Sequence, residues 1–149
     1  MCSSDLLKKD PKNSRTVYYL AQSYMCANEF ARALKYYRMR SKMAGMKEEV
    51  FWSLFSVGFL EHELKKPFAA IVESYSAAFI WDSTRLEPLY NLALYLKEND
   101  LSFLGYLVAE LGVSIPRQSG YQHLQVQHVY DSSMAQVYAE LAFCFATKR

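Results

Sequence analysis

The sequence is poor in the residues that shape tight turns and in those that crosslink small secreted folds. Among 149 residues there are five glycines and four prolines, too few for an all-β protein built on many turns. The three cysteines, Cys2, Cys26 and Cys144, are widely separated and lack C-x-x-C spacing. They predict no disulfide framework and indicate a reducing compartment, the cytoplasm. The small numbers of glycine, proline and cysteine favour a helical protein whose helices are joined by a few short loops.

Long apolar runs and an excess of charge are also missing. The longest strongly apolar stretch, FWSLFSVGFL at 51–60, is about half of the roughly 20 residues that span a bilayer. No apolar run follows a basic start at the N-terminus, so we expect neither a membrane span nor a signal peptide. The net charge of +2 is mixed along the chain, which predicts no nucleic-acid partner.

Motifs for chemistry are scarce as well. There is no G-x-S-x-G, and no cysteine has a histidine nearby in the sequence; a pair from distant positions, such as Cys26 with His62, stays open. The run EHE at 61–63 would point its side chains about 100° apart on a helix. His123 and His128 are five apart in an uncertain segment. The sequence therefore predicts no catalytic residue, no metal site and no cofactor, and the chain is predicted not to be an enzyme.

The chain does contain, at short intervals, residues that typically start or end helices. Asn13 or Ser14 can cap a first helix, and Thr84 with Glu87 has the spacing of a capping box. Gly45 and Gly112 are expected at helix ends, Gly45 in a left-handed turn. The remaining helices are expected from Asn28, from about Lys47 to Leu64, near Pro67, from Asn99 and Asp100, and from about Val129 to Ala146.

These helices form pairs whose apolar and small positions recur. A unit that begins at residue 14 places Val17, Leu20, Ala21, Tyr24, Ala33 and Tyr37 in the slots that Leu89, Leu92, Ala93, Leu96, Gly105 and Ala109 hold in a unit beginning at 86. A unit beginning at 52 fits less well and lies 34 residues before the unit at 86. Thirty-four residues is the period of the tetratricopeptide repeat (TPR), a helix–turn–helix unit.

The predicted fold is therefore all-α, a right-handed α-solenoid of antiparallel helix pairs, with about three repeats and a C-terminal capping helix. A generic helical bundle is the alternative. We expect a single domain over residues 1–149, a fragment of or accessory to a larger protein. Its repeats are expected at about 14–47, 48–83 and 84–116, with a capping segment at 117–149.

Several segments together resemble a known family. They look like the TPR-type region found next to family-2 glycosyltransferase domains. The segments are NSRTVYYLAQSY (13–24), ARALKYYRMRSKMAG (31–45), EEVFWSLF (48–55), TRLEPLYNLA (84–93) and HVYD (128–131). The resemblance implies an accessory helical region, because the chain has no D-x-D motif and no Gly-rich phosphate loop. The stretch SGYQHLQVQ before HVYD departs from the family.

In the repeat geometry the first helix of each pair lines a concave face with its positions 2, 5, 9 and 12. We expect partner-binding residues there, with Arg85 at the rim: Arg15, Tyr18, Gln22, Met25, Arg85, Glu87, Tyr90 and Leu94. The second unit would contribute Ser53, Ser56, Leu60 and Glu63. This mixture of polar and aromatic side chains is typical of a peptide-binding surface.

Three functions follow, in order of preference. The first is a non-catalytic scaffold that binds a peptide or protein partner and serves a glycosyltransferase. The second is a structural domain that packs on a catalytic domain or forms a homo-oligomer. The third is a part of the glycosyltransferase enzyme itself.

Overall fold

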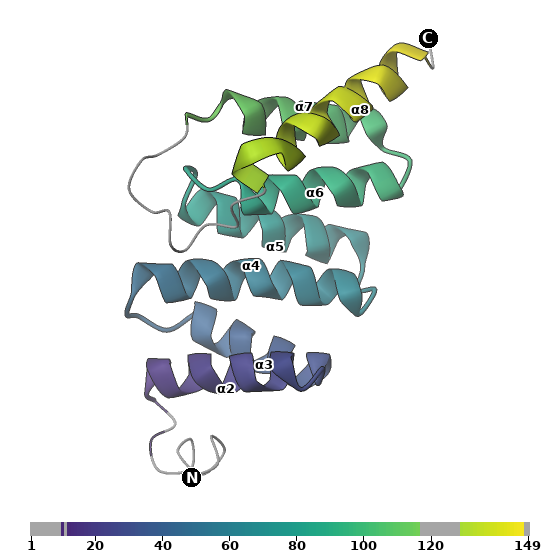
Figure 1. Cartoon of the computed structure of the whole chain (residues 1–149). Coiled ribbons are helices and arrows are strands. Elements are labelled where there is room, and N and C mark those ends of the chain that lie inside the picture. The colour runs from purple at the N-terminus through teal and green to yellow at the C-terminus, as the bar shows by residue number, and fades with distance from the viewer. Residues whose placement is uncertain (1–9, 11, 117–128, 148–149) are drawn as a thin grey trace. The chain divides into compact units, whose positions relative to one another are not determined.

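The computed structural model describes residues 10, 12–116 and 129–147, and every element among them is helical (Figure 1). The chain divides into two compact units, Met1–Ala78 and Phe79–Arg149. The helix α5 crosses this boundary, with its last three residues in the second unit. Each unit is described in turn.

The first unit contains α2 (Ser14–Cys26), α3 (Phe30–Ser41), α4 (Lys47–Glu63) and most of α5 (Phe68–Trp81). α3 packs against both α2 and α4. Two of the small residues that recur in the repeat, Ala21 and Ala33, are fully buried. The core of the first helix pair and α4 comprises Ala21, Ala33, Leu34, Tyr37, Val57 and Leu60.

A glycine sets the distance between α4 and α5. A methyl group added at Gly58 would lie 2.8 Å from Cδ1 of the buried Tyr75 ring. Atoms of a real side chain do not approach so closely, so the ring occupies the space that any larger residue would need. Gly58 thus allows an aromatic residue of α5 to pack closely against the α4 backbone.

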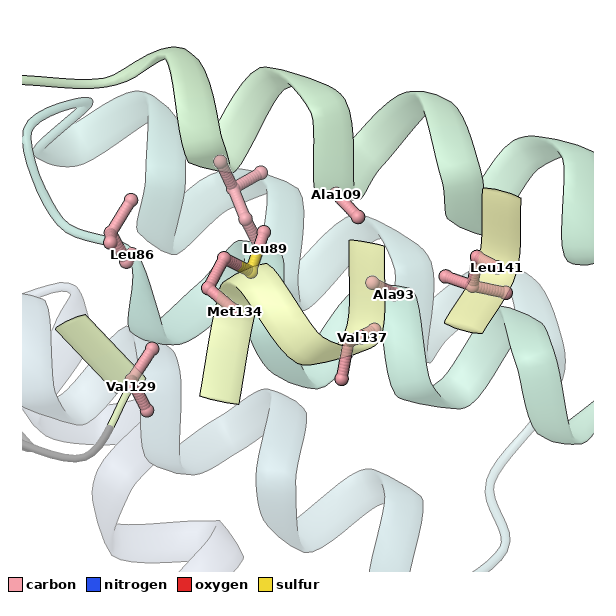
Figure 2. Close-up of a cluster of buried hydrophobic side chains, with 8 residues drawn as sticks. All are labelled: Leu86, Leu89, Ala93, Ala109, Val129, Met134, Val137 and Leu141. Carbon is pink, nitrogen blue, oxygen red and sulfur yellow. The ribbon is translucent and has the colours of Figure 1, made fainter. Parts of the chain in front are cut away.

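The second unit contains α6 (Glu87–Glu98), α7 (Ser102–Ser114), the π-helical turn η1 (Val129–Ser133) and α8 (Met134–Thr147). α7 packs against both α6 and α8, so the final helix covers the last helix pair, as a capping helix should. Figure 2 shows the core that they share: Leu86, Leu89, Ala93, Ala109, Val129, Met134, Val137 and Leu141. The helix predicted from about Val129 to Ala146 is therefore present, and its first turn is π-helical.

The turn within each helix pair repeats in the backbone. Asn28, Lys65 and Asp100 adopt left-handed φ angles of 58°, 52° and 60°. The amide of the next residue then bonds to the carbonyl five residues back, at 2.9 Å from Glu29 N to Tyr24 O. The same bond joins Lys66 N to Glu61 O at 2.8 Å and Leu101 N to Leu96 O at 2.9 Å. This is the Schellman arrangement, which satisfies carbonyls at a helix end.

Three predicted helix starts are corrected by the structure, two of them at these turns. Asn28 and Asp100 do not cap the following helices, because they hold the left-handed position of the turn, and α3 and α7 begin two residues after them. The Thr84–Glu87 capping box is wrong. The Thr84 hydroxyl donates to Asp82 Oδ1 at 2.6 Å, and α6 begins at Glu87.

Two predicted helix ends also shift. α3 ends at Ser41, where Lys42 N bonds to Met39 O and Met43 N to Arg40 O in a tightened last turn. Gly45 lies beyond that end with φ of 134°, a positive value but outside the compact left-handed region. Gly112 lies inside α7, where a methyl group would overlap the Met134 side chain.

Candidate partner-binding face

α2 separates packing residues from exposed ones. Its start is fixed by Asn13, whose side-chain oxygen accepts a hydrogen bond from Thr16 N at 3.1 Å, as predicted for an N-cap. Val17, Leu20 and Ala21 are buried. The four residues predicted to meet a partner lie elsewhere on the helix: Arg15 is exposed and Tyr18, Gln22 and Met25 are half-buried.

The repeating turns also fix which residues of α4 are equivalent to these. Placing Asn28, Lys65 and Asp100 at the same position of the repeat starts the three repeats at residues 14, 51 and 86. The second repeat thus begins one residue earlier than the position 52 that the sequence predicted. In this register Gly58 takes the slot of Ala21 and Ala93, which explains the poor fit of the earlier alignment.

The one-residue shift changes the candidate residues of α4. Ser53 and Leu60, expected to face a partner, are fully buried. Positions 2, 5, 9 and 12 are held instead by half-buried side chains: Trp52, Phe55, Phe59 and His62. We call these four, together with Arg15, Tyr18, Gln22 and Met25, the α2–α4 face. Sequence reasoning missed the α4 half because the left-handed residue of that repeat is a lysine.

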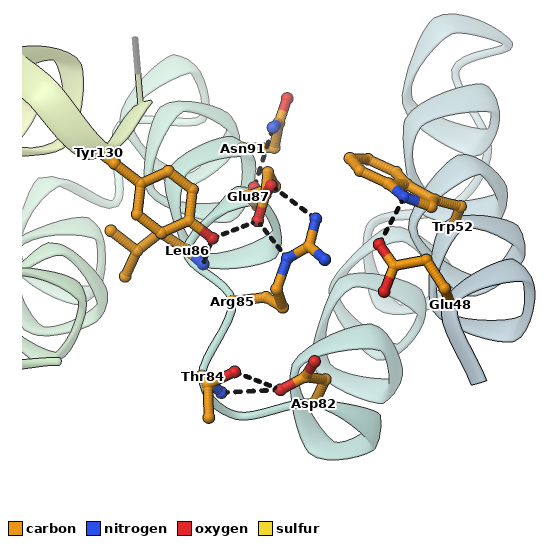
Figure 3. A network of polar contacts seen from close by, with 9 residues as sticks. All are labelled: Glu48, Trp52, Asp82, Thr84, Arg85, Leu86, Glu87, Asn91 and Tyr130. Carbon is orange, nitrogen blue, oxygen red and sulfur yellow. Dashed lines mark hydrogen bonds and ion pairs between the residues drawn. The ribbon is translucent and has the colours of Figure 1, made fainter. Parts of the chain in front are cut away.

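Polar contacts hold the N-terminal half of this face. The Trp52 indole donates to Glu48 Oε1 at 3.0 Å, one turn away on α4 (Figure 3). The ring of Trp52 lies edge-on to Phe51 and Phe55, with centroids 5.3 and 5.6 Å apart. An anchored indole within a cluster of rings presents a fixed aromatic surface, which loses little conformational freedom when a partner binds.

The charges at the junction of α2 and α4 are arranged asymmetrically. Glu49 accepts from the fully buried Arg40, at 3.2 Å from Nε and 2.8 Å from Nη2. Its other oxygen lies 3.9 Å from Nε of Arg15, whose side chain is 63 % exposed and covers the Tyr19 ring at 5.8 Å. Such a long, exposed ion pair contributes little. Arg15 is thus a cation that can turn to an incoming carboxylate at small cost.

Tyr18 lies close enough to Glu49 and Glu48 for their charges to change its pKa. Burial raises the pKa of its phenol, and the negative charges of Glu49 and Glu48 raise it further. Its ring meets Tyr37 of α3 edge-on, with centroids 6.2 Å apart. Tyr18 therefore stays a neutral hydrogen-bonding group on the α2–α4 face across the physiological range.

The predicted residues of α6 divide into two kinds. Tyr90 and Leu94 are half-buried and pack against the core of the second unit. Arg85 and Glu87 are only 2 % and 1 % exposed, whereas the sequence placed Arg85 at an accessible rim. Side chains so deeply buried cannot contact a partner directly in this conformation.

Arg85 and Glu87 form a buried network with the C-terminal segment (Figure 3). Arg85 Nη2 lies 2.9 Å from Glu87 Oε1, and the Tyr130 hydroxyl donates to Glu87 Oε2 at 2.9 Å. The same hydroxyl accepts from Leu86 N at 3.1 Å. The network ties η1 to the start of α6, so the role of these residues is to hold the helix that carries Tyr90 and Leu94.

The side chains of Glu61 and Glu63 lie in different environments, as expected for nearby residues on a helix. Glu61 is buried, and it accepts from Arg38 Nη2 and from the Ser74 hydroxyl, both at 2.6 Å. Glu63 is exposed. Among the described residues no group of three or more His, Cys, Asp or Glu could hold a metal ion. His123 and His128 lie outside the described residues.

Comparison with known proteins shows the fold. No protein-family model and no curated protein matches the sequence. Among solved structures, the crystal structure of MamA, a TPR-like protein, is similar to this chain. The match covers 98 % of this chain and 86 % of the MamA chain, with a TM-score of 0.67 and 14 % sequence identity. At this identity the likeness shows the fold alone. The chain has the all-α, TPR-like fold of helix pairs that the sequence predicted.

Proposed function

We propose that this chain is a non-catalytic interaction module that binds a peptide or protein partner on its α2–α4 face. The observation that carries the proposal is the composition of that face. It joins an exposed, weakly held cation, Arg15, to a row of half-buried aromatic side chains that includes Tyr18 and Trp52. Aromatic anchors and arginine are the residues that dominate binding energy at protein interfaces.

The chemistry of the face defines the partner. Rings that lose little freedom on binding favour an apolar or aromatic side chain of the partner. Arg15 favours a carboxylate beside it, since a guanidinium binds a carboxylate with two parallel hydrogen bonds. The proposed partner is therefore a segment that carries an apolar anchor next to an acidic residue.

α6 provides a second contact region in this proposal. Tyr90 and Leu94 are accessible enough to touch a partner. Arg85 and Glu87 contribute by positioning α6, because both are buried in their ion pair. The TPR-like fold supports this assignment, since repeats of helix pairs commonly present extended binding surfaces.

The resemblance to helical regions beside family-2 glycosyltransferases extends the proposal. The chain would act as the accessory module that brings a protein substrate to such an enzyme, in the cytoplasm. The free cysteines Cys26 and Cys144 suit a reducing compartment. Among the described residues no helix is long and apolar enough to cross a membrane.

Peptide selection followed by titration tests the proposal. Peptides selected from a random library on the purified chain would be titrated calorimetrically against the wild type and against Arg15→Ala and Tyr18→Ala. We expect each substitution to weaken binding by about tenfold or more, with unchanged circular dichroism. Lys35→Ala, an exposed cation on α3, is the matched control. Equal affinities for all four proteins would contradict the proposal.

A structural role is the second candidate, because α7 carries exposed apolar residues that include Phe103 and Leu107. Such residues on a surface helix mark a packing site. Oligomerisation through them is compatible with partner binding on the α2–α4 face.

A further inference from the structure

α7 is apolar on two opposite sides. One side packs into the second unit through Gly105, Ala109 and Gly112, all buried. The other side exposes four large apolar residues, which we call the α7 strip: Phe103 (50 %), Leu104 (46 %), Leu107 (42 %) and Leu111 (45 %). At about 100° per residue these four fall within an arc of roughly 100°. The strip is thus continuous along a little over two turns.

Charge is almost absent from this helix. Its sequence SFLGYLVAELGVS contains one ionisable carboxylate, Glu110, which lies at one edge of the α7 strip. Surface helices normally place polar residues on the side away from the core, and a helix that is apolar all round is normally buried. The composition of α7 is therefore that of a helix covered on both sides.

The strip provides a large share of the apolar area that one side of a dimer interface needs. With about 200 Å² for a fully exposed side chain of this size, the four exposed fractions give roughly 370 Å² of apolar surface. A standard interface takes about 800 Å² from each partner, a little over half of it apolar, or roughly 450 Å². The strip supplies most of that apolar area.

We propose that the α7 strip is a homodimer interface, covered by the same strip of a second copy of this chain. A two-fold axis near Leu107, the middle of the strip, makes the surface self-complementary. It brings the two copies of Leu107 together and sets Phe103 of each copy against Leu111 of the other. Glu110 then lies at the rim, where charge is tolerated. The interface is centred on α7 and does not depend on the α2–α4 face.

Sedimentation equilibrium of the full chain, from low to high micromolar concentration, tests the interface. We expect a monomer–dimer equilibrium in the wild type. For Leu107→Lys the dissociation constant of the dimer should be at least about tenfold higher. Val113→Lys is the matched control, since Val113 lies on the same helix outside the strip and is similarly exposed, at 43 %. It should dimerise as the wild type does.

Two results would overturn the interface: a wild type that stays monomeric at high micromolar concentration, or equal effects of the two lysine substitutions. Circular dichroism checks that Leu107→Lys folds. If this variant does not fold, cysteine crosslinking takes the place of the lysine substitutions. It uses a chain whose native cysteines are changed to serine. With a mild oxidant added, Leu107→Cys should form a disulfide-linked dimer rapidly and Val113→Cys should not. Equal crosslinking at both positions would equally overturn the proposal.

Discussion

The Tyr130 hydroxyl donates to Glu87 Oε2 at 2.9 Å and accepts from Leu86 N at 3.1 Å. One phenol from the C-terminal segment thereby satisfies a buried carboxylate and a backbone amide at the start of α6. Hydrogen bonds to charged groups are the stronger ones in proteins, and a buried group left without its partner costs more than the bond contributes. The stability of the second unit should depend on this contact.

Tyr130→Phe removes the hydroxyl and keeps the ring. We expect the free energy of unfolding to fall by about 1–3 kcal/mol, because Glu87 and Leu86 each lose a partner. Urea denaturation followed by circular dichroism measures it. Tyr36→Phe, which removes a hydroxyl from the stacked Tyr24–Tyr36 pair, should change stability by less than about 0.5 kcal/mol. Equal losses in the two variants would contradict the role of Tyr130.

The same phenol predicts a dependence on pH. Burial, followed by the charge of Glu87 and its hydrogen bond, raises the pKa of Tyr130 to about 12 from its ordinary value of 10.0. The folded state then holds the proton more tightly than the unfolded chain, so this stabilisation is complete below pH 10 and is lost as the pH rises through 12. Urea denaturation across that window should show a steeper loss for the wild type than for Tyr130→Phe. Burial also raises the pKa of Tyr37 to about 12, but Tyr37 is present in both proteins, so parallel slopes would refute the prediction.

The left-handed Lys65 offers a stabilising substitution. A side chain in this conformation costs roughly 1 kcal/mol, which glycine avoids, although glycine loses more entropy on folding. We expect Lys65→Gly to raise the free energy of unfolding by up to about 1 kcal/mol. Lys66→Gly, one residue later and outside the left-handed position, should lower it by about 0.5–1 kcal/mol. Thermal melts of the pair would show opposite shifts, and shifts of the same sign would be evidence against the Schellman turn.

Gly58 should not tolerate a methyl group. Its Cβ would press on the buried Tyr75 ring at 2.8 Å, so Gly58→Ala is expected to cost about 1–2 kcal/mol despite the better helix propensity of alanine. Tyr75→Leu makes room, and in that background the same substitution should cost about 1 kcal/mol less. Chemical denaturation of the four proteins in this cycle measures the coupling. A cost that is independent of residue 75 would rule out the contact.

Much of the fold could be predicted from sequence because apolar and small residues recur at helical spacing. Ala21, Ala33 and Ala93 are buried as their slots required. Helix boundaries were harder to predict. Asn28 can cap a helix or occupy a left-handed turn, and only the hydrogen bonds of the assembled helix pair decide between the two.

The candidate residues of α2 keep their predicted positions, exposed or half-buried, whereas those of α4 change with the register of the repeat. Lysine is an uncommon residue at a left-handed position, so nothing in the sequence marked Lys65 as the landmark that fixes the register of α4. A shift of one residue exchanged the buried Ser53 for the half-buried Trp52. The buried pairs of Arg40 with Glu49 and Arg85 with Glu87 depend on tertiary packing, which spacing alone does not reveal.

Trp52 lies within the α2–α4 face, so its indole signal reports directly on the proposed binding of a partner there. The chain has two tryptophans, so a ¹H–¹⁵N spectrum should contain two indole N–H signals, which Trp81→Phe would assign. Titration with a selected peptide should shift or broaden the Trp52 signal, while Trp81, which belongs to the second unit, serves as the internal control. A Trp52 signal that stays in place when the peptide is saturating would contradict the account.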